Sequence, residues 1–406
     1  MNPFSCKALG PVQLTCQSIF PKPPNSPSVV SNLHIAHGLL GNSNNWMTAA
    51  KRLVQHPFLV KKVHGAFALD MRNHGTSPHL PIHCNAALAS DLEGVILNSQ
   101  RSINSVTNTI AQHSVLIGHS MGGLAVMGLL LRRYNEKAIF DSLAVNEEEK
   151  GDDSAGTFGK WSFAQRQECA AAMEAVNESF GFSRNEPLRD VIFYDPNALK
   201  GENNSLSFPP GASSPPLHGR ISACVIVDIT PTDDFRKDVQ SDNDIFRTMD
   251  CMTKVDLSVI QNYNDIQKEL IRVGITEKDM RGFIATNIVL NSKEKGGAAS
   301  WRCNLPILVD FYSEFAPNIV QWFDNKDVMK HKRQNGIEPQ PCTLPILFVF
   351  GENSPFNNSA QRKRLKKFFP NLQEVVVEGS GHFVHYEKME AFVEATSPFI
   401  SEHLQK

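Results

Sequence analysis

Apolar residues along the chain fall into short runs that alternate with longer amphipathic stretches. The short runs are rich in Val, Ile, Leu and Phe and have the length of buried strands. They lie at 33–36, 63–69, 115–117, 223–227, 344–350 and 374–377, and 10–20 could hold a first strand or hairpin. The helical stretches lie at 45–54, 86–101, 122–131 and 387–404. Because strand and helix alternate, the pattern predicts an α/β fold with a mostly parallel sheet covered by helices.

Two regions interrupt this alternation and divide the chain. The range 141–220 contains a charge run and a stretch rich in Asn, Ser, Pro and Gly, so we expect a partly disordered insertion. The range 232–343 is helical, and we expect it to form a cap. Its apolar residues at helical spacing either belong to the core or line a substrate pocket: Val259, Tyr263, Ile266 and Leu270. The other predicted parts are a leader at 1–28, core at 29–140, a core strand at 221–231 and core again at 344–406.

Composition excludes several classes of protein. Of the 406 residues, 41% are apolar and 20% are charged, and the net charge is −2, so no nucleic acid or anionic membrane is expected as a partner. The eight cysteines are spread out without a C-x-x-C pair, which indicates free thiols in a reducing compartment and no metal site.

The chain contains no stretch that predicts a transmembrane helix. The most apolar one, Val115 to Leu131, is interrupted by His119, Ser120 and several glycines. The first 69 residues contain no Asp or Glu, as in an organelle transit peptide, but no Arg precedes Arg52. The leader is therefore either a targeting segment or a disordered tail, on an intracellular protein.

The strongest chemical signal is the G-x-S-x-G pattern at Gly118-His119-Ser120-Met121-Gly122. A serine on a tight turn between a buried strand and a buried helix exposes its hydroxyl to a cleft, and the glycines leave room for the turn. The apolar run before it and the apolar helix after it supply this context. We therefore predict the α/β-hydrolase fold, with Ser120 as a nucleophile.

A serine nucleophile needs a base and an acid that orients the base. In this fold the order is Ser, acid, His, which favours His382, in a glycine-flanked loop after the last strand, over His385. For the acid, the usual place after the strand 344–350 holds Ser354 where an aspartate is expected. The alternatives are Asp228, at the end of the preceding strand, and Glu352, and we prefer Asp228.

The oxyanion of an acyl-transfer intermediate needs two backbone N–H donors. We expect them from Met121, which follows the nucleophile, and from Leu39 in the loop after the early strand. His37 is more consistent with a structural role in that loop, and Asp70 with a loop organiser. The elbow lacks the lysine of a phosphate-binding loop, so no nucleotide and no other cofactor is expected.

Several segments together resemble the alpha/beta hydrolase domain-containing protein 11 family and its small bacterial esterase relatives. The resemblance covers roughly residues 30–140 and 220–400. Besides the elbow, the segments are His37-Gly38-Leu39-Leu40-Gly41 with Asn45-Trp46, Asp70-Met71-Arg72-Asn73-His74-Gly75, Val227-Asp228-Ile229-Thr230-Pro231, Trp301-Arg302-Cys303-Asn304 and Gly351-Glu352-Asn353-Ser354.

The resemblance implies hydrolysis of carboxylic esters, and a mitochondrial location as in many eukaryotic members. It also supports Asp228 as the acid, as in the bacterial relatives. Some animal members are assigned the acid at another position, which is Pro306 in this chain, and a proline cannot act as the acid. The insertion at 141–220 departs from the family, whose members have a short connection there.

We therefore expect a serine esterase that acts on small-molecule esters or thioesters. An acyltransferase or thioesterase could use the same residues, because the acceptor pocket decides between them. A fold that binds a ligand without catalysis is the third alternative. Dehalogenase or epoxide-hydrolase chemistry is disfavoured because it would place an aspartate at position 120.

Overall fold

In the computed structural model, the described part of the chain centres on one large sheet. The described residues are 9–23, 31–104, 113–136, 139–140, 163–182, 188, 192–193, 220–231, 245–291, 297–311 and 340–404. The leader's first eight residues, residues 24–30 and most of 141–219 and 312–339 lie outside this set.

The sheet has seven strands in the order β1-β3-β2-β4-β5-β8-β9. All neighbours are parallel except the edge strand β1, which pairs antiparallel with β3. The strands are β1 Cys16–Ile19, β2 Ser31–Ala36, β3 Val63–Leu69, β4 His113–His119, β5 Arg220–Val227, β8 Ile346–Gly351 and β9 Leu372–Val377. Five of the six predicted runs lie within strands, the sixth begins two residues before β8, and β1 lies within 10–20.

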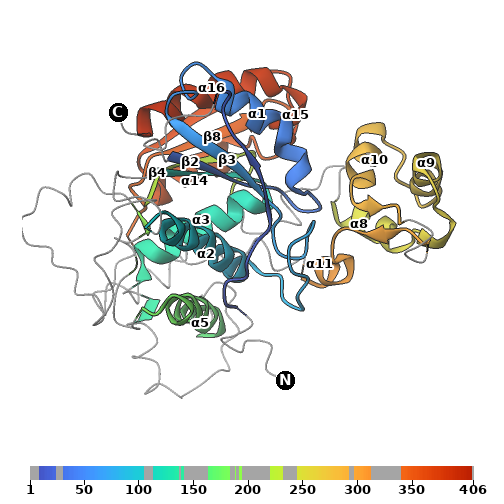
Figure 1. The fold of residues 1–406 in the computed structure, drawn as a ribbon, viewed down its shortest axis with the longest axis horizontal. Coiled ribbons are helices and arrows are strands. Elements are labelled where there is room, and N and C mark those ends of the chain that lie inside the picture. Colours follow the sequence, from blue (N-terminus) through green and yellow to red (C-terminus); the bar gives the residue numbers. More distant parts are fainter. Residues whose placement is uncertain are drawn as a thin grey trace, which may run out of the picture.

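Helices cover both faces of the sheet, because alternate strand residues point to opposite sides (Figure 1). On one face, α1 and α16 bury their apolar sides against strand residues such as Val115 and Val225. On the other face, α2, α3 and α14 pack against residues such as Leu116 and Ile226. These helices are α1 Met47–Gln55, α2 Asn85–Asn104, α3 Met121–Tyr134, α14 Ser359–Phe368 and α16 Met389–His403. The predicted α/β class and mostly parallel sheet are therefore confirmed.

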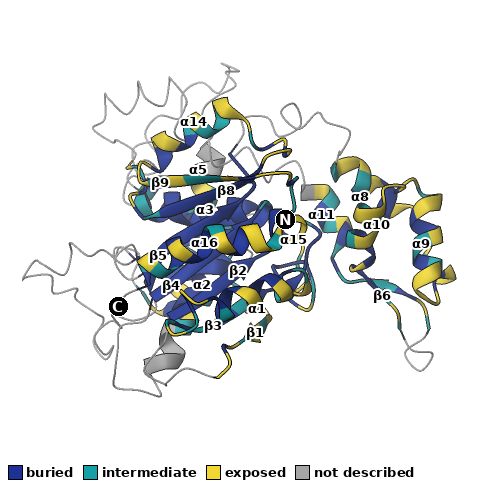
Figure 2. Cartoon of the chain, turned by 90° about the horizontal axis from the view of Figure 1, so that it is seen from above, coloured by how far each residue is buried: buried dark blue, intermediate teal, exposed yellow. Residues whose placement is uncertain are grey.

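A second group of helices lies to one side of the sheet (Figures 1 and 2). It contains α8 Ile245–Thr253, α9 Tyr263–Arg272, α10 Lys278–Ala285, α11 Leu305–Phe311 and the two-stranded β6 Ile288–Val289 and β7 Ser300–Trp301. Two asparagine contacts join it to the sheet's loops. Asn287 donates its side-chain amide to the carbonyl of Leu40 at 2.5 Å, and the Asn304 backbone donates to the carbonyl of Asn73 at 2.8 Å. We call α8 to α11 the cap helices.

Only half of the four apolar residues predicted to share a face in the cap are buried. Ile266 and Leu270 are buried on α9, whereas Val259 and Tyr263 are 52% and 59% exposed. Val259 belongs to a separate short 3-10 turn, Leu257–Val259, so it does not share the α9 helix face. No helix in the described ranges is long and apolar enough to cross a membrane.

Within 141–220 the structure describes the helix α5, Phe163–Phe180, which packs against α2. Its Val176 is fully buried, and Asn177 accepts a hydrogen bond from Arg133 of α3 at 3.3 Å. That guanidinium is itself buried and paired with Glu93 and Glu136. Unpaired buried charges are costly, so this helix helps to seal an ion cluster on the outer side of α2 and α3.

The strand register brings the functional loops to one edge. Ala36 pairs with Gly118, and Gly118 pairs with Ile226, so β2, β4 and β5 end at the same level. The segments that follow them carry Leu39, Ser120 and Asp228. In open parallel sheets, ligands bind outside the carboxyl ends of the strands, and this edge is where such a site is expected.

Candidate active site

Ser120 stands on a strained turn between β4 and α3. Its φ of 51° lies in the left-handed region, where non-glycine residues are uncommon and backbone strain is stored. The turn closes tightly, because a Cβ on Gly118 would lie 2.6 Å from the carbonyl oxygen of Gly122, and one on Gly122 would collide with the carbonyl of Ala36. The local geometry is that of the elbow predicted from the G-x-S-x-G pattern.

Asp228 and His382 meet although they are 154 residues apart. His382 Nδ1 lies 2.7 Å from Asp228 Oδ2, and the carboxylate is fully buried at the end of β5. The other carboxylate oxygen accepts the Gly351 N–H at 2.9 Å. An acceptor on Nδ1 favours the tautomer that leaves Nε2 free to take a proton. This pair therefore has the geometry of an acid that orients a base.

Ser354 supports this acid. It occupies the position at which an aspartate was expected, and its hydroxyl donates a hydrogen bond to Asp228 Oδ2, the oxygen that also faces His382. Glu352, the alternative acid, lies elsewhere, because its carboxylate accepts the Gly379 N–H at 2.8 Å. The structure brings Asp228, and not Glu352, to the histidine.

The loop that carries His382 is fixed by two residues that the sequence did not single out. Glu387 accepts the N–H of Gly381 at 2.5 Å and that of Phe383 at 3.0 Å, on either side of the histidine. His119 Nε2 lies 3.1 Å from the His382 carbonyl oxygen. Their partners are backbone groups of a folded loop, so residue spacing alone gave no signal for these contacts.

His385 is placed differently from His382. It is buried, and its ring stacks on Trp46 with centroids 3.9 Å apart and planes 3° from parallel. Burial, together with the neighbouring His382, lowers the pKa of His385 to about 3. The ring is therefore neutral near pH 7 and acts as a packed aromatic.

The loop after β2 is held by neutral histidines. His37 Nε2 accepts the Met71 N–H at 3.0 Å, so its Nδ1 donates to the Gly38 carbonyl at 2.7 Å. His74 Nε2 accepts the Leu40 N–H at 3.1 Å. Burial lowers the pKa of both rings, and that of His74 falls to about 3. These contacts shape the backbone on both sides of Leu39.

Asp70 organises the neighbouring loop. Its carboxylate accepts the N–H of Ser43 at 2.7 Å and that of Thr76 at 2.8 Å. Burial acts to raise the pKa of Asp70, but these hydrogen bonds outweigh it and hold the pKa below its usual value. The carboxylate is thus an acceptor for loop backbone.

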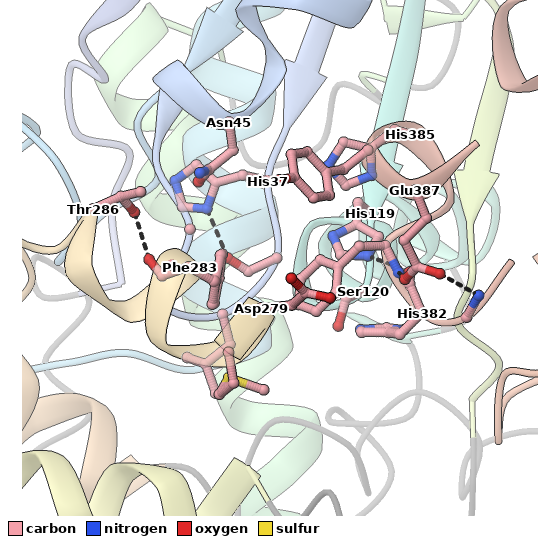
Figure 3. A pocket seen from close by; sticks show the side chains of 18 of the residues that line it. His37, Asn45, His119, Ser120, Asp279, Phe283, Thr286, His382, His385 and Glu387 are labelled. Atoms are coloured by element: carbon pink, nitrogen blue, oxygen red, sulfur yellow. Dashed lines mark hydrogen bonds between the residues drawn. The ribbon is translucent and has the colours of Figure 1, made fainter. Parts of the chain in front are cut away.

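Ser120, the histidine loop and the loop after β2 border one cavity of about 1070 Å³ (Figure 3). Leu39, Ser120, Met121 and His382 line it from the sheet side, and α9 and α10 line it from the cap. Met121 is the first residue of α3, where N–H groups have no partner within the helix. The cap meets the histidine loop through Phe283 and Phe383, whose ring centroids are 5.0 Å apart. The cavity therefore encloses the Ser120 hydroxyl between the sheet edge and the cap.

The described side chains offer no cluster of three or more His, Cys, Asp or Glu residues that could hold a metal ion. The titratable side chains at the site are instead arranged as a hydroxyl, an imidazole and a carboxylate, a set that can carry out acyl transfer unaided.

Comparisons with known proteins identify the family and the fold. The alpha/beta hydrolase family matches residues 35–256, which is more than half of the chain. The sn-1-specific diacylglycerol lipase ABHD11 of Mus musculus is 24% identical over 90% of this chain and 79% of its own length. Esterase YbfF of Escherichia coli is 24% identical over 93% of this chain and 94% of its own length. A solved marine microorganism esterase superposes with a TM-score of 0.57 at 19% identity, over 96% of this chain and 99% of its own.

Proposed function

Because this chain belongs to the alpha/beta hydrolase family, we propose that it hydrolyses carboxylic esters of small molecules through Ser120, His382 and Asp228. The relatives named as an esterase and a lipase support ester cleavage. The observation that carries the assignment of residues is the 2.7 Å contact between His382 Nδ1 and the buried Asp228, beside a cavity that Ser120 also lines.

The mechanism has two steps that share one proton shuttle. His382 Nε2 takes the hydroxyl proton as Ser120 Oγ attacks the ester carbonyl, and the N–H groups of Leu39 and Met121 stabilise the oxyanion. His382 then protonates the leaving alcohol, and an acyl group remains on Ser120. A water molecule, deprotonated by His382, then attacks this acyl-enzyme, and His382 returns the proton to the Ser120 oxygen as the acid leaves. Every proton is accounted for by the imidazole, so no cofactor is required.

A fluorophosphonate probe tests the proposal directly, because it phosphonylates only an activated serine. We expect one adduct by intact mass on the full-length protein, mapped to Ser120 by peptide sequencing. The same protein should hydrolyse short-chain esters, which can be measured by the acid released. A folded protein that takes no adduct would instead support a ligand-binding role, and acyl transfer to added alcohols in preference to water would identify an acyltransferase.

The choice between the two acids gives a second test. We predict that Asp228→Asn lowers kcat by about 10⁴-fold, because the amide no longer stabilises the imidazolium and favours the wrong tautomer. Glu352→Gln keeps an oxygen acceptor for the Gly379 N–H and should change kcat by less than about threefold. Steady-state kinetics on one neutral ester measures both variants, and circular dichroism checks that they are folded. The assignment is wrong if the two effects are reversed.

We also propose a mitochondrial location. The leader without Asp or Glu and the family resemblance both favour it. Fluorescent fusions at the C-terminus, made with and without residues 1–28, should separate a mitochondrial signal from a diffuse one.

A further inference from the structure

The cap presents one carboxylate to the cavity that the proposed chemistry does not use. Asp279 lies in the first turn of α10 and lines the cavity together with Phe283 and Thr286. Residues three and four apart share a helix face. Positions 279, 283 and 286 therefore form one side of α10, and the contacts of the other two show where that side points.

Both of those contacts are with the sheet side of the site. Phe283 packs on Phe383, the residue after His382, and Thr286 lies 3.3 Å from the side-chain nitrogen of Asn42 in the loop after β2. Asp279 therefore extends from the helix face that is turned to the catalytic centre. Figure 3 shows its carboxylate directed into the cavity, toward the region of Ser120 and His382.

Three other charged side chains of the cavity wall are engaged elsewhere. Glu277 caps α10 by accepting the N–H groups of Asp279 and Met280, and Glu387 holds the backbone of the histidine loop. Arg281 donates to Gln267 and to the Thr276 carbonyl.

Lys278, which also borders the cavity, is exposed at the start of α10. Five positions separate it from Phe283, which places it about 140° around the helix from that residue. Among the described residues Asp279 makes no ion pair. Its exposed carboxylate therefore has no ion-pair partner there that would compete with a substrate.

Resting on the proposed function, we propose that Asp279 is a specificity-determining residue that selects the charge of the substrate. The site then favours esters that are cationic or neutral where they extend toward the cap, and disfavours anionic ones. Two unit charges interact more strongly across a partly enclosed cavity than in bulk water. Salt weakens this interaction, because mobile ions screen exposed charges.

The test uses esters that differ in charge but hardly in shape. Butyrylcholine and 3,3-dimethylbutyl butyrate differ by a quaternary nitrogen in place of a carbon on the alcohol end, and 3-sulfopropyl butyrate carries a negative charge there. Methyl esters of 4-(trimethylammonio)butanoate and 5,5-dimethylhexanoate form the matching pair on the acyl end. Acid release in a pH-stat gives kcat/KM for each ester with the full-length protein.

The readout is a ratio of ratios, which cancels the intrinsic reactivity of each ester. We expect D279N to lower the ratio of kcat/KM for the cationic ester to that for the neutral ester by about threefold, on the alcohol or the acyl end. D279K should lower the same ratio by about tenfold. The kcat/KM of the neutral ester should change by less than about twofold in both variants. The wild-type preference should shrink in 1 M NaCl, where the Debye length is about 3 Å. The matched control is D250N. Asp250 lies on α8 outside the cavity wall, and its exposed carboxylate pairs with Lys254, so its loss should leave the ratio unchanged.

Each outcome decides one level of the argument. An unchanged ratio in D279N on both ends, or an equal shift in D250N, overturns the role of Asp279 while ester hydrolysis stands. Equal losses on charged and neutral esters would indicate a structural role and also overturn it. A protein that hydrolyses none of these esters, the neutral ones included, overturns the proposed function and this inference with it.

Discussion

Replacing His382 with alanine lowers kcat for a neutral ester on the order of 10⁶-fold, while the protein remains folded. Among the described residues, the imidazole is the one base placed on the buried Asp228 carboxylate, at 2.7 Å. Without it the Ser120 proton has no acceptor, and a neutral hydroxyl is a poor nucleophile. Single-turnover kinetics and fluorophosphonate labelling should both show the loss, because each reports attack by Ser120.

The second histidine of the same segment provides the control. His385→Phe keeps an aromatic ring against Trp46, where the native rings are 3.9 Å apart, and removes both ring nitrogens. Since the pKa of His385 is about 3, it carries no useful proton at pH 7, and its loss should lower kcat by less than about tenfold. The assignment fails if His385→Phe loses activity as His382→Ala does, or if His382→Ala stays active.

The sequence predicted the central strands well because they are buried on both faces. Ala223, Val225 and Val227 pack toward one layer of helices, and Cys224 and Ile226 toward the other, so the run has no polar position to obscure it. The helix α14 was not predicted. Its cationic residues hide a narrow apolar side, formed by Leu365 and Phe368.

The site was predicted in part, since local turns are encoded locally and partners are not. The glycines around Ser120 indicate a tight turn by themselves, and the structure places that turn at a φ of 51°. The choice between Asp228 and Glu352 depends on how β5, β8 and the histidine loop lie in space. Only the fold shows that Glu352 is taken up by the Gly379 N–H.

The supporting residues were the hardest to predict, because their contacts form only in the folded chain. Ser354 was noticed only as a departure from an expected aspartate, yet its hydroxyl lies on Asp228. Glu387 accepts two N–H groups that converge only after the loop has folded around His382. Such contacts orient the proposed catalytic groups without touching a substrate, and composition and spacing do not predict them.

Ser120→Ala should lose as much activity as His382→Ala, on the order of 10⁶-fold in kcat, while KM for a neutral ester stays within about threefold. The alanine keeps the Met121 N–H and the cavity wall, so substrate binding survives. Its effect on stability is small, because the hydroxyl borders the cavity and the turn is held by a backbone hydrogen bond from the Ser120 N–H to the Val227 carbonyl at 3.0 Å.

The double variant Ser120→Ala/His382→Ala tests whether the two side chains act as one unit. If His382 works only by taking the Ser120 proton, removing both groups should cost no more than removing either one, so the double variant falls no further than the single ones. A further loss beyond about tenfold in the double variant would show that His382 activates water or another group independently of Ser120. The same residual rate in all three variants would leave the oxyanion donors and binding as its source, which is what a single nucleophile–base pair requires.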